Sequence, residues 1–378
     1  MYQMRMNINF KKWILLFSVI FSFIVCACTQ KHYDNEYFNG KIQNIQNGNC
    51  IYKQVFSKIL SLEGTYYGIP ATYDSLILFY NPKLKTKAFN INNIKTKKEI
   101  GTFCEKGNGP EESVAFSPIY YFFKEGEELK THLFAPNERK LFQWNITQSI
   151  KKQHTHYDKI VPFSFCEKKS SVFFQHIFQL TADTVIAKVG VQAVGEFDAT
   201  LPFYQKLNIQ TGQSTQEYRP FKKTIINEEA TIIPEVFYYT YSAIKPDKSK
   251  LVEAMRNLPQ INIIDLETGE TIGFRTKDED DFSIFKKKNK DLKIHFCNLT
   301  ADNNYIYAVY CGKERQKQGG DFKINTINVF NWEGELKYQL TTDCDIFETT
   351  LDEINNRLYM TVRGKDEVRY IELNEVID

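Results

Sequence analysis

The feature that most constrains the fold of this chain is a polar turn that recurs at regular intervals and leads each time into a run of apolar residues. The turn occurs six times, and successive copies are 52 to 64 residues apart. One residue of each turn serves as a marker of the repeat: Asp74, Glu127, Asp183, Asp247, Asn303 and Asn355. A fixed period of this length is typical of chains built from repeated supersecondary units.

Each repeat also has the composition of β-strands. Runs such as "LILFYN", "TVIAKVG" and "RLYMTVR" are rich in Phe, Tyr, Ile and Val, and a second polar turn, such as "DLETGET", follows each marker. Two turns flanked by strands give four antiparallel strands in each repeat. Six repeats predict an all-β six-bladed β-propeller of four-stranded antiparallel blades. A seven-bladed ring and a pair of β-sandwiches are the alternatives. Since no long apolar segment has a helical period, an α/β fold is not expected.

The sixth repeat predicts how the ring closes. It ends at Asp378 after only three strands, whereas the unassigned run at 51–62 has strand composition. An N-terminal strand would complete the last blade and remove an open edge. We therefore expect Ile51–Ser57 to pair with Glu367–Asn374, within a propeller that spans residues 49–378.

Residues 1–27 predict export. They contain three basic residues, no acidic residue and an uncharged run of thirteen residues, which is short for a membrane span and typical of a signal peptide. The end of this run, "VCAC", resembles a bacterial lipobox. The resemblance implies that Cys28 carries the lipid and that Cys26 leaves with the signal peptide. An uncleaved transmembrane anchor and a Cys26–Cys28 metal pair are the alternatives. Residues 28–48 are polar and are expected to form a tether.

The charge balance limits the expected partners. Without residues 1–27 the chain has 45 basic and 46 acidic residues, so no nucleic acid is expected as a partner. The predicted contact is with a membrane, through the lipid on Cys28. The residue directly after Cys28 is not Asp, which favours the outer membrane and leaves the leaflet open.

Six further cysteines show no recognisable framework. Their spacings match neither a compact set of disulfides nor a zinc motif. Export would permit disulfides, so their presence stays open. No metal and no cofactor are predicted.

The segment "FCEKGNGPEES", which follows the first repeat, adds a family resemblance. Together with the lipobox, the six repeats and the "LFAPNERKLFQWNI" hairpin, it resembles the TolB-like six-bladed β-propeller lipoproteins of Bacteroides-type bacteria. Those proteins carry a Gly-x-Gly-Pro-Gly-Glu loop here. Gly107, Gly109, Pro110 and Glu112 match it, whereas Glu111 stands in place of a glycine. The resemblance implies the fold and the cell envelope, and it specifies no reaction.

Two histidines are candidates for lining a central channel. His176 and His295 lie in apolar runs that are expected to be the innermost strands of their blades. The chain has no nucleophile elbow, zinc-protease motif or phosphate-binding loop, so no catalytic residue is assigned.

Loop lengths point to one face of the disc. The connections after the second and fourth strands of the blades are the long ones, and in a propeller they emerge on the same face. The candidate binding residues on this face are Gly107, Gly109, Pro110, Glu112, Lys313, Arg315 and Lys317. The first hypothesis is a non-enzymatic binding or scaffold lipoprotein that holds a protein, peptide or glycan there. The alternative is a carbohydrate-active enzyme of the envelope with channel-facing carboxylates.

Overall fold

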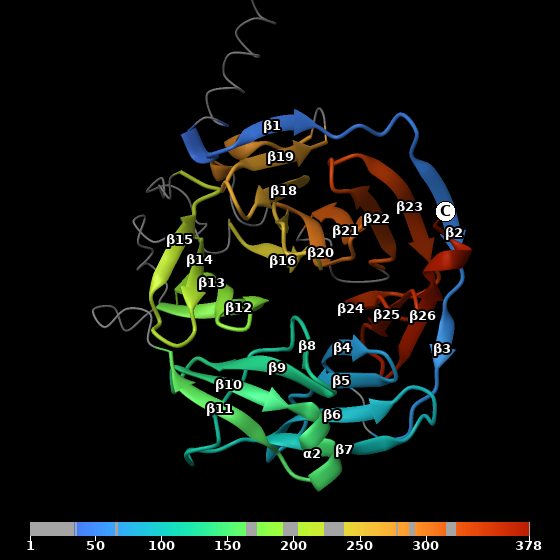
Figure 1. Ribbon diagram of the computed structural model, residues 1–378. Helices are drawn as coiled ribbons and strands as arrows, with labels where there is room; N and C mark the ends of the chain where they lie inside the picture. The colour runs from blue at the N-terminus through green and yellow to red at the C-terminus, as the bar shows by residue number, and fades with distance from the viewer. Residues whose placement is uncertain are drawn as a thin grey trace, which may run out of the picture.

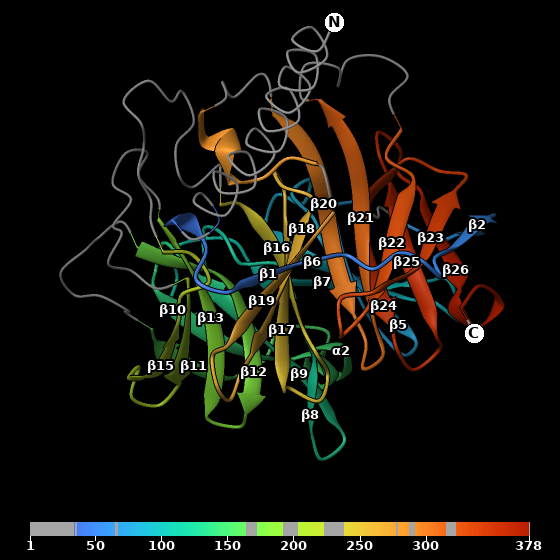
Figure 2. The same cartoon turned by 90° about the horizontal axis from the view of Figure 1, so that it is seen from above.

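The computed structural model describes residue 34 and residues 36–64, 67–163, 172–191, 203–222, 238–276, 279–286, 292–314 and 323–377. These residues form a six-bladed β-propeller, so the predicted fold is confirmed. Figure 1 looks down the axis of the ring, and Figure 2 shows the disc from the side. None of the helices in the described part of the chain is both long and apolar enough to cross a membrane. The expected signal peptide, 1–27, and Cys28 lie outside the described residues.

The blades follow one another along the chain, each from the innermost strand outward. Blade one has β4 (Ile69–Tyr73), β5 (Leu76–Tyr80), β6 (Lys87–Asn93) and β7 (Glu99–Glu105). Blade two has β8 (Phe123–Glu125), β9 (Glu128–Ala135), β10 (Lys140–Asn145) and β11 (Tyr157–Pro162). Blade three has β12 (Val172–Thr181), β13 (Thr184–Val191), β14 (Tyr204–Asn208) and β15 (Ser214–Tyr218).

Blades four to six use strands from the N-terminus as well. Blade four has β16 (Thr240–Ile244), β17 (Lys250–Met255), β18 (Gln260–Asp265) and β19 (Thr271–Arg275). Blade five has β20 (Lys293–Ala301), β21 (Tyr305–Glu314), β22 (Thr326–Asn331) and β23 (Leu336–Thr342). Blade six has β24 (Ile346–Asp352), β25 (Arg357–Val362) and β26 (Val368–Glu372). Short 3-10 turns follow β19 (η1, Phe282–Lys286) and β26 (η4, Leu373–Glu375).

The N-terminal segment runs around the outside of these three blades (Figure 1). β1 (Lys41–Asn44) and β2 (Ile51–Val55) pair in parallel with β19 and β23, so each is a fifth strand. β3 (Lys58–Leu60) pairs antiparallel with β26 and completes blade six. An N-terminal strand thus closes the ring as predicted, but the expected residues were wrong: Ile51–Val55 pairs with blade five instead. Both β2 and β3 have residues that favour strands, and this composition does not determine which open strand edge each of them joins.

The described part of the expected tether, 36–48, is packed against the propeller. Phe38 is 1% exposed, and its ring contacts those of Phe221 and Phe282. Arg275 of β19 forms an ion pair of 2.8 Å with Asp34. Aromatic burial and a largely desolvated ion pair fix this segment on blade four.

The hydrophobic core is distributed over the blade interfaces. Each pair of neighbouring blades shares its own cluster of buried residues; for example, Trp144 and Phe89 lie between blades one and two. Because β-strands alternate their side chains, each blade can present apolar residues to both neighbours. Every interface therefore stabilises the ring.

All six marker residues of the repeat lie in the turns between the first and second strands of their blades. Some of these turns bind each other across blades. The Asp247 amide donates to the Asn303 side chain at 3.0 Å, and the Asn355 side chain donates to the Asp74 carbonyl oxygen at 3.1 Å. The recurring polar residues therefore connect the blades at the face of the disc that carries the short turns.

One second turn of the repeat is a helix. The segment "NITQS" of blade two forms α2 (Ile146–Lys152), which begins after Asn145. The Asn145 side chain accepts a hydrogen bond of 2.9 Å from the Gln148 amide, which is the usual way in which an asparagine caps a helix.

Candidate functional site

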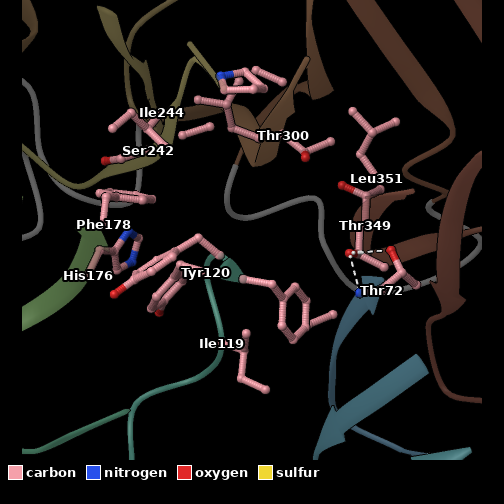
Figure 3. A pocket seen from close by; sticks show the side chains of 18 of the residues that line it. Thr72, Ile119, Tyr120, His176, Phe178, Ser242, Ile244, Thr300, Thr349 and Leu351 are labelled. Atoms are coloured by element: carbon pink, nitrogen blue, oxygen red, sulfur yellow. Dashed lines mark hydrogen bonds between the residues drawn. The ribbon is translucent and has the colours of Figure 1, made fainter. Parts of the chain in front are cut away.

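A cavity of about 480 Å³ lies where the innermost strands of the six blades converge (Figure 3). Its wall is formed by β4, β12, β16, β20 and β24, together with residues 119–123, which lead into β8. We refer to it as the central pocket. Pockets that bind small molecules typically have volumes of about 300–1,000 Å³, so this one is large enough for a ligand.

Aromatic rings form much of the wall. The rings of Tyr120 and His176 are stacked, with centroids 4.1 Å apart, and Phe178 lies next to them (Figure 3). The ring of Tyr239, which directly precedes β16, meets that of Tyr241 on β16 edge to face, with centroids 5.2 Å apart. Tyr239 keeps 39% of its surface exposed, although it lies at the centre of the disc. Such rings offer flat apolar faces to a ligand.

His176 presents a neutral imidazole to the pocket. Burial, followed by the positive charge of Lys188, lowers the pKa of His176 well below its usual range. Its Nδ1 atom is buried and has no hydrogen-bond partner in the described part of the chain. A buried polar atom without a partner costs free energy, so Nδ1 is a suitable contact for a polar group of a ligand or for a water molecule.

The opposite side of the wall carries hydroxyl and amide groups from blades one, five and six. The Thr72 amide donates to the Thr350 hydroxyl at 3.2 Å, and the two hydroxyls lie 3.1 Å apart. The Thr349 hydroxyl donates to the Asn298 side-chain oxygen at 2.7 Å. These groups are already oriented by one another before any ligand binds.

Glu348 is a partly buried acid of this wall. Its carboxylate accepts a hydrogen bond from the Asn298 side-chain amide. Burial raises the pKa of Glu348 to about 7, against the opposing effects of the Asn298 hydrogen bond and the Arg363 charge. A carboxyl group with this pKa changes the charge of the pocket close to neutral pH.

One end of the pocket lies at the face of the short turns. The lining extends to Lys248 in the β16–β17 turn and to Glu353 and Ile354 in the β24–β25 turn, and all three are exposed. Asp352, also at this end, is buried and accepts hydrogen bonds from the amides of Ile354 and Asn355. The Asp352 carboxylate is therefore occupied by its own turn.

A buried polar network supports the wall from behind Ser242. The Ser242 hydroxyl lies 2.7 Å from that of Tyr204, which donates to Glu253 at 2.6 Å. Lys188 donates to the hydroxyl and to the carbonyl oxygen of Thr240, both at 2.6 Å, and the Thr240 hydroxyl donates to Glu253 at 2.9 Å. Burial lowers the pKa of Lys188 to about 8, although the Glu253 charge raises it. Because the Lys188 ammonium group is engaged in these contacts, it holds β13 against β16.

The two candidate channel histidines lie in different places. His176 on β12 belongs to the pocket wall. His295 on β20 is completely buried, and its ring nitrogens lie 3.8 Å from a Glu279 carboxylate oxygen and 3.6 Å from one of Asp280. The side chain of His295 therefore points away from the pocket and toward the segment that follows blade four. Strand position alone could not separate the two, because successive residues of an inner strand face different sides.

The glycine-bearing loop forms a closed turn. The Gly109 amide donates to the Glu112 carboxylate at 2.9 Å, and Lys140 donates to the Pro110 carbonyl oxygen at 3.3 Å. A Cβ atom on Gly107 would lie 1.9 Å from a carboxylate oxygen of Glu112, so a larger residue there would displace that side chain. These contacts give the loop a structural role.

The other candidate residues of the long-loop face lie apart from the pocket. Lys313 is exposed near the end of β21, and Arg315 and Lys317 lie outside the described residues. Among the described residues, no three His, Cys, Asp or Glu side chains gather in a way that could hold a metal ion.

Most of the residues that line the pocket are not among the sequence-predicted candidates, although the repeat contains a signal for them. Every lining residue except Lys248 lies within the eight positions before one of the six repeat markers. The segments before the markers, such as "IYYFF" and "FETTLD", could therefore have been read together as one wall.

Comparisons with known proteins agree with the fold. Neither the models of known protein families nor the curated proteins match this sequence. Among solved structures, the chain is similar to a member of the DUF4221 family from Bacteroides vulgatus, with a TM-score of 0.52, 10% identity, and coverage of 88% of this chain and 96% of that one. A protein from Bacteroides fragilis described as exported gives a TM-score of 0.48 and 9% identity, covering 86% and 84% of the two chains. A gluconolactonase from Xanthomonas campestris gives 0.47 and 10%, covering 82% and 87%. At these identities the first likeness shows the propeller fold alone, and the other two carry no argument about this chain.

Proposed function

We propose that this protein is a lipid-anchored propeller of the cell envelope that binds a glycan in its central pocket. The observation that carries the proposal is the wall of the pocket, to which all six blades contribute and which combines aromatic faces with hydroxyl and amide groups. The site proposed here is the pocket on the axis of the ring, whereas the sequence led us to expect binding at the loops of the long-loop face.

The chemistry of the wall favours a carbohydrate over a charged ligand. Sugar rings have apolar C–H faces and a rim of hydroxyl groups. Stacked Tyr120 and His176 offer an apolar face, whereas Thr72, Ser242 and Asn298 offer hydrogen-bond partners. A few polar groups placed in an otherwise apolar wall are typical of pockets that recognise small molecules.

Binding to a panel of oligosaccharides and peptides, measured by calorimetry with the mature protein, tests this proposal. We expect an oligosaccharide to bind and Tyr120→Ala to weaken its binding by about 30-fold, since a buried aromatic contact is worth on the order of 2 kcal/mol. The matched control is Tyr52→Ala, because Tyr52 is 69% exposed on the outer rim and should not affect binding. Binding of peptides alone, or equal effects of the two substitutions, would contradict a glycan site in the pocket.

A second candidate function is carbohydrate hydrolysis, and the raised pKa of Glu348 favours it. A carboxyl group with a pKa of about 7 can donate a proton as a general acid at neutral pH. Glycosidases need a second carboxylate, and Glu353 is the candidate because Asp352 is held by its turn. If the protein is a hydrolase, Glu348→Gln should abolish turnover of a bound oligosaccharide and preserve its binding. If it is a binding protein, the wild type should leave the oligosaccharide intact.

The lipid anchor is tested separately. Cells grown with a fatty acid that carries a clickable tag should label the wild-type protein and the Cys26→Ala variant. Cys28→Ala should lose the label and be found in the soluble envelope fraction. Labelling of Cys28→Ala would contradict Cys28 as the attachment site, and fractionation of labelled cells tests the proposed outer membrane location.

A further inference from the structure

Two cysteine side chains meet on the long hairpin of blade five. Phe296 on β20 is paired with Tyr310 on β21, and their rings pack 5.5 Å apart. Because side chains alternate along a strand, the next residues, Cys297 and Cys311, point to the other face of the blade. Both pack there against the core cluster shared by blades five and six, and their thiols form a side-chain hydrogen bond.

An irregularity in the strand pairing makes this contact possible. In a regular antiparallel ladder, residues placed as these two are would be diagonal neighbours, about 7–8 Å apart. The register shifts on both sides of Phe296, so that neither Cys297 nor Cys311 has a paired residue on the other strand. Extra residues of this kind bend a strand and redirect its side chains. Here they accompany contact between the two sulfur atoms.

The surroundings of the pair favour a reactive thiolate at Cys311, whereas the hydrogen bond with Cys311 and burial raise the pKa of the Cys297 thiol. Arg256 and Arg363 lie close enough to Cys297 to stabilise negative charge, and Arg363 and Lys313 do the same for Cys311. The Lys313 amide also donates a hydrogen bond to Cys311. The hydrogen bond with Cys297 is the largest of the effects that lower the pKa of Cys311. Both side chains are only partly buried, and reactive cysteines are typically found at such accessible, positively charged places.

The other described cysteines differ from this pair. Cys104 is completely buried, and burial raises the pKa of its thiol well above the usual range. Cys344 is buried, and Cys50 is half-buried; burial raises the pKa of both thiols. These three provide internal controls.

We propose that Cys297 and Cys311 are a redox-active pair that is converted to a disulfide by an external disulfide. The Cys311 thiolate attacks the external disulfide, forms a mixed disulfide and releases one thiolate. Cys297 then loses its proton, attacks the Cys311 sulfur and releases the second thiolate. The two protein thiols lose two electrons and two protons, and the external disulfide is reduced to two thiols.

The disulfide would stiffen one wall of the central pocket. Asn298, which orders Glu348 and Thr349, follows Cys297 directly in β20. A covalent link between β20 and β21 at this point restricts the motion of Asn298 relative to the rest of blade five. The redox proposal itself rests on the thiols and not on the identity of any ligand.

The test uses the purified mature protein and oxidised glutathione. After reduction, exposure to oxidised glutathione and alkylation of the remaining thiols, mass spectrometry should find one peptide pair joined through Cys297 and Cys311. Cys297→Ser removes the thiol that resolves the mixed disulfide, so this variant should accumulate glutathione on Cys311. Cys104→Ser, the control, should form the same cross-linked pair as the wild type.

Three results would overturn the proposal. They are alkylation of both thiols after full exposure to oxidised glutathione, a disulfide that joins either cysteine to another residue, and the absence of the glutathione adduct in Cys297→Ser. The Cys297→Ser variant is first compared with the wild type by circular dichroism and by its urea midpoint. If it is not folded, Cys297→Ala under the same treatment takes its place and must give the adduct.

Discussion

Removing the Glu253 carboxylate should destabilise the propeller far more than removing a surface acid. Glu253 is completely buried between blades three and four, where it accepts hydrogen bonds of 2.6 Å from Tyr204 and 2.9 Å from Thr240. It also provides the negative charge nearest to the buried ammonium group of Lys188. Glu253→Ala leaves two buried hydroxyl groups without this acceptor and removes the negative charge that favours the buried ammonium group of Lys188.

The size of this effect follows from those losses. Breaking a buried charge pair by removing one partner typically costs about 3–5 kcal/mol, and each unsatisfied buried donor costs about 1–3 kcal/mol. These costs overlap, because the same carboxylate serves the hydroxyls and the ammonium group. We therefore expect the free energy of unfolding to fall by about 4 kcal/mol. Lys188→Met should cost a similar amount, because it leaves the Glu253 charge buried without its cation.

Urea denaturation followed by tryptophan fluorescence measures these changes. The control is Glu270→Ala, because the Lys41–Glu270 pair spans 3.0 Å with both side chains more than half exposed, and such pairs are worth about 0–1 kcal/mol. In the double variant Lys188→Met/Glu253→Ala neither charge remains buried, so its loss should be smaller than the sum of the single losses by about 2 kcal/mol. If Glu253→Ala cost no more than Glu270→Ala, or if the single effects were additive, the network would not hold the two blades together.

Three further predictions concern other parts of the ring. Burial lowers the pKa of His132 to about 4, so between pH 6.5 and 4 this side chain is protonated in the unfolded chain and neutral in the folded one. As the pH falls from 6.5 to 4, the wild type should therefore lose up to about 3 kcal/mol more of its free energy of unfolding than His132→Gln. Equal pH profiles of the two proteins would contradict this. Phe38→Ala should cost about 3–5 kcal/mol in the free energy of unfolding, because the ring is 1% exposed; an unchanged urea midpoint would mean that the N-terminal segment does not stabilise blade four. Gly334 has φ +81°, and a Cβ atom there would lie 2.2 Å from the Phe274 ring, so Gly334→Ala should lower the free energy of unfolding by about 2 kcal/mol or more. Gly364 has φ +72° with open space around it, so Gly364→Ala should lower the free energy of unfolding less. The melting temperatures of the two variants compare the effects.

The architecture was predictable because its signal repeats along the chain. A polar turn before each second strand recurs six times, and the structure explains why: turns such as those of Asp247 and Asn303 bind each other across neighbouring blades. The same logic correctly implied closure by an N-terminal strand. It failed to choose between Ile51–Val55 and Lys58–Leu60, because each of them meets an open strand edge and the sequence around them is equally extended. Which edge a strand joins is decided by chain length and geometry outside the strand itself.

The central pocket could not be predicted residue by residue for a related reason. A pocket at the axis is lined by short pieces of six blades, so its neighbours in space are at least about a whole repeat apart in the chain. Thr72 and Thr350, in the first and last blades, are 278 residues apart and form a hydrogen bond. Both His176 and His295 were predicted to line the channel, and only His176 does so. The bulges of β20 set the direction in which the buried His295 side chain points. Glu348 is not among the sequence-predicted candidates, since an isolated glutamate in a strand belongs to no motif. Its raised pKa comes from burial among the blades, which exists only once the ring closes and which outweighs the lowering effect of the Asn298 hydrogen bond. In a propeller, therefore, the period of the sequence specifies the scaffold, and the chemistry of the axis arises from residues that share only their distance from a repeat marker.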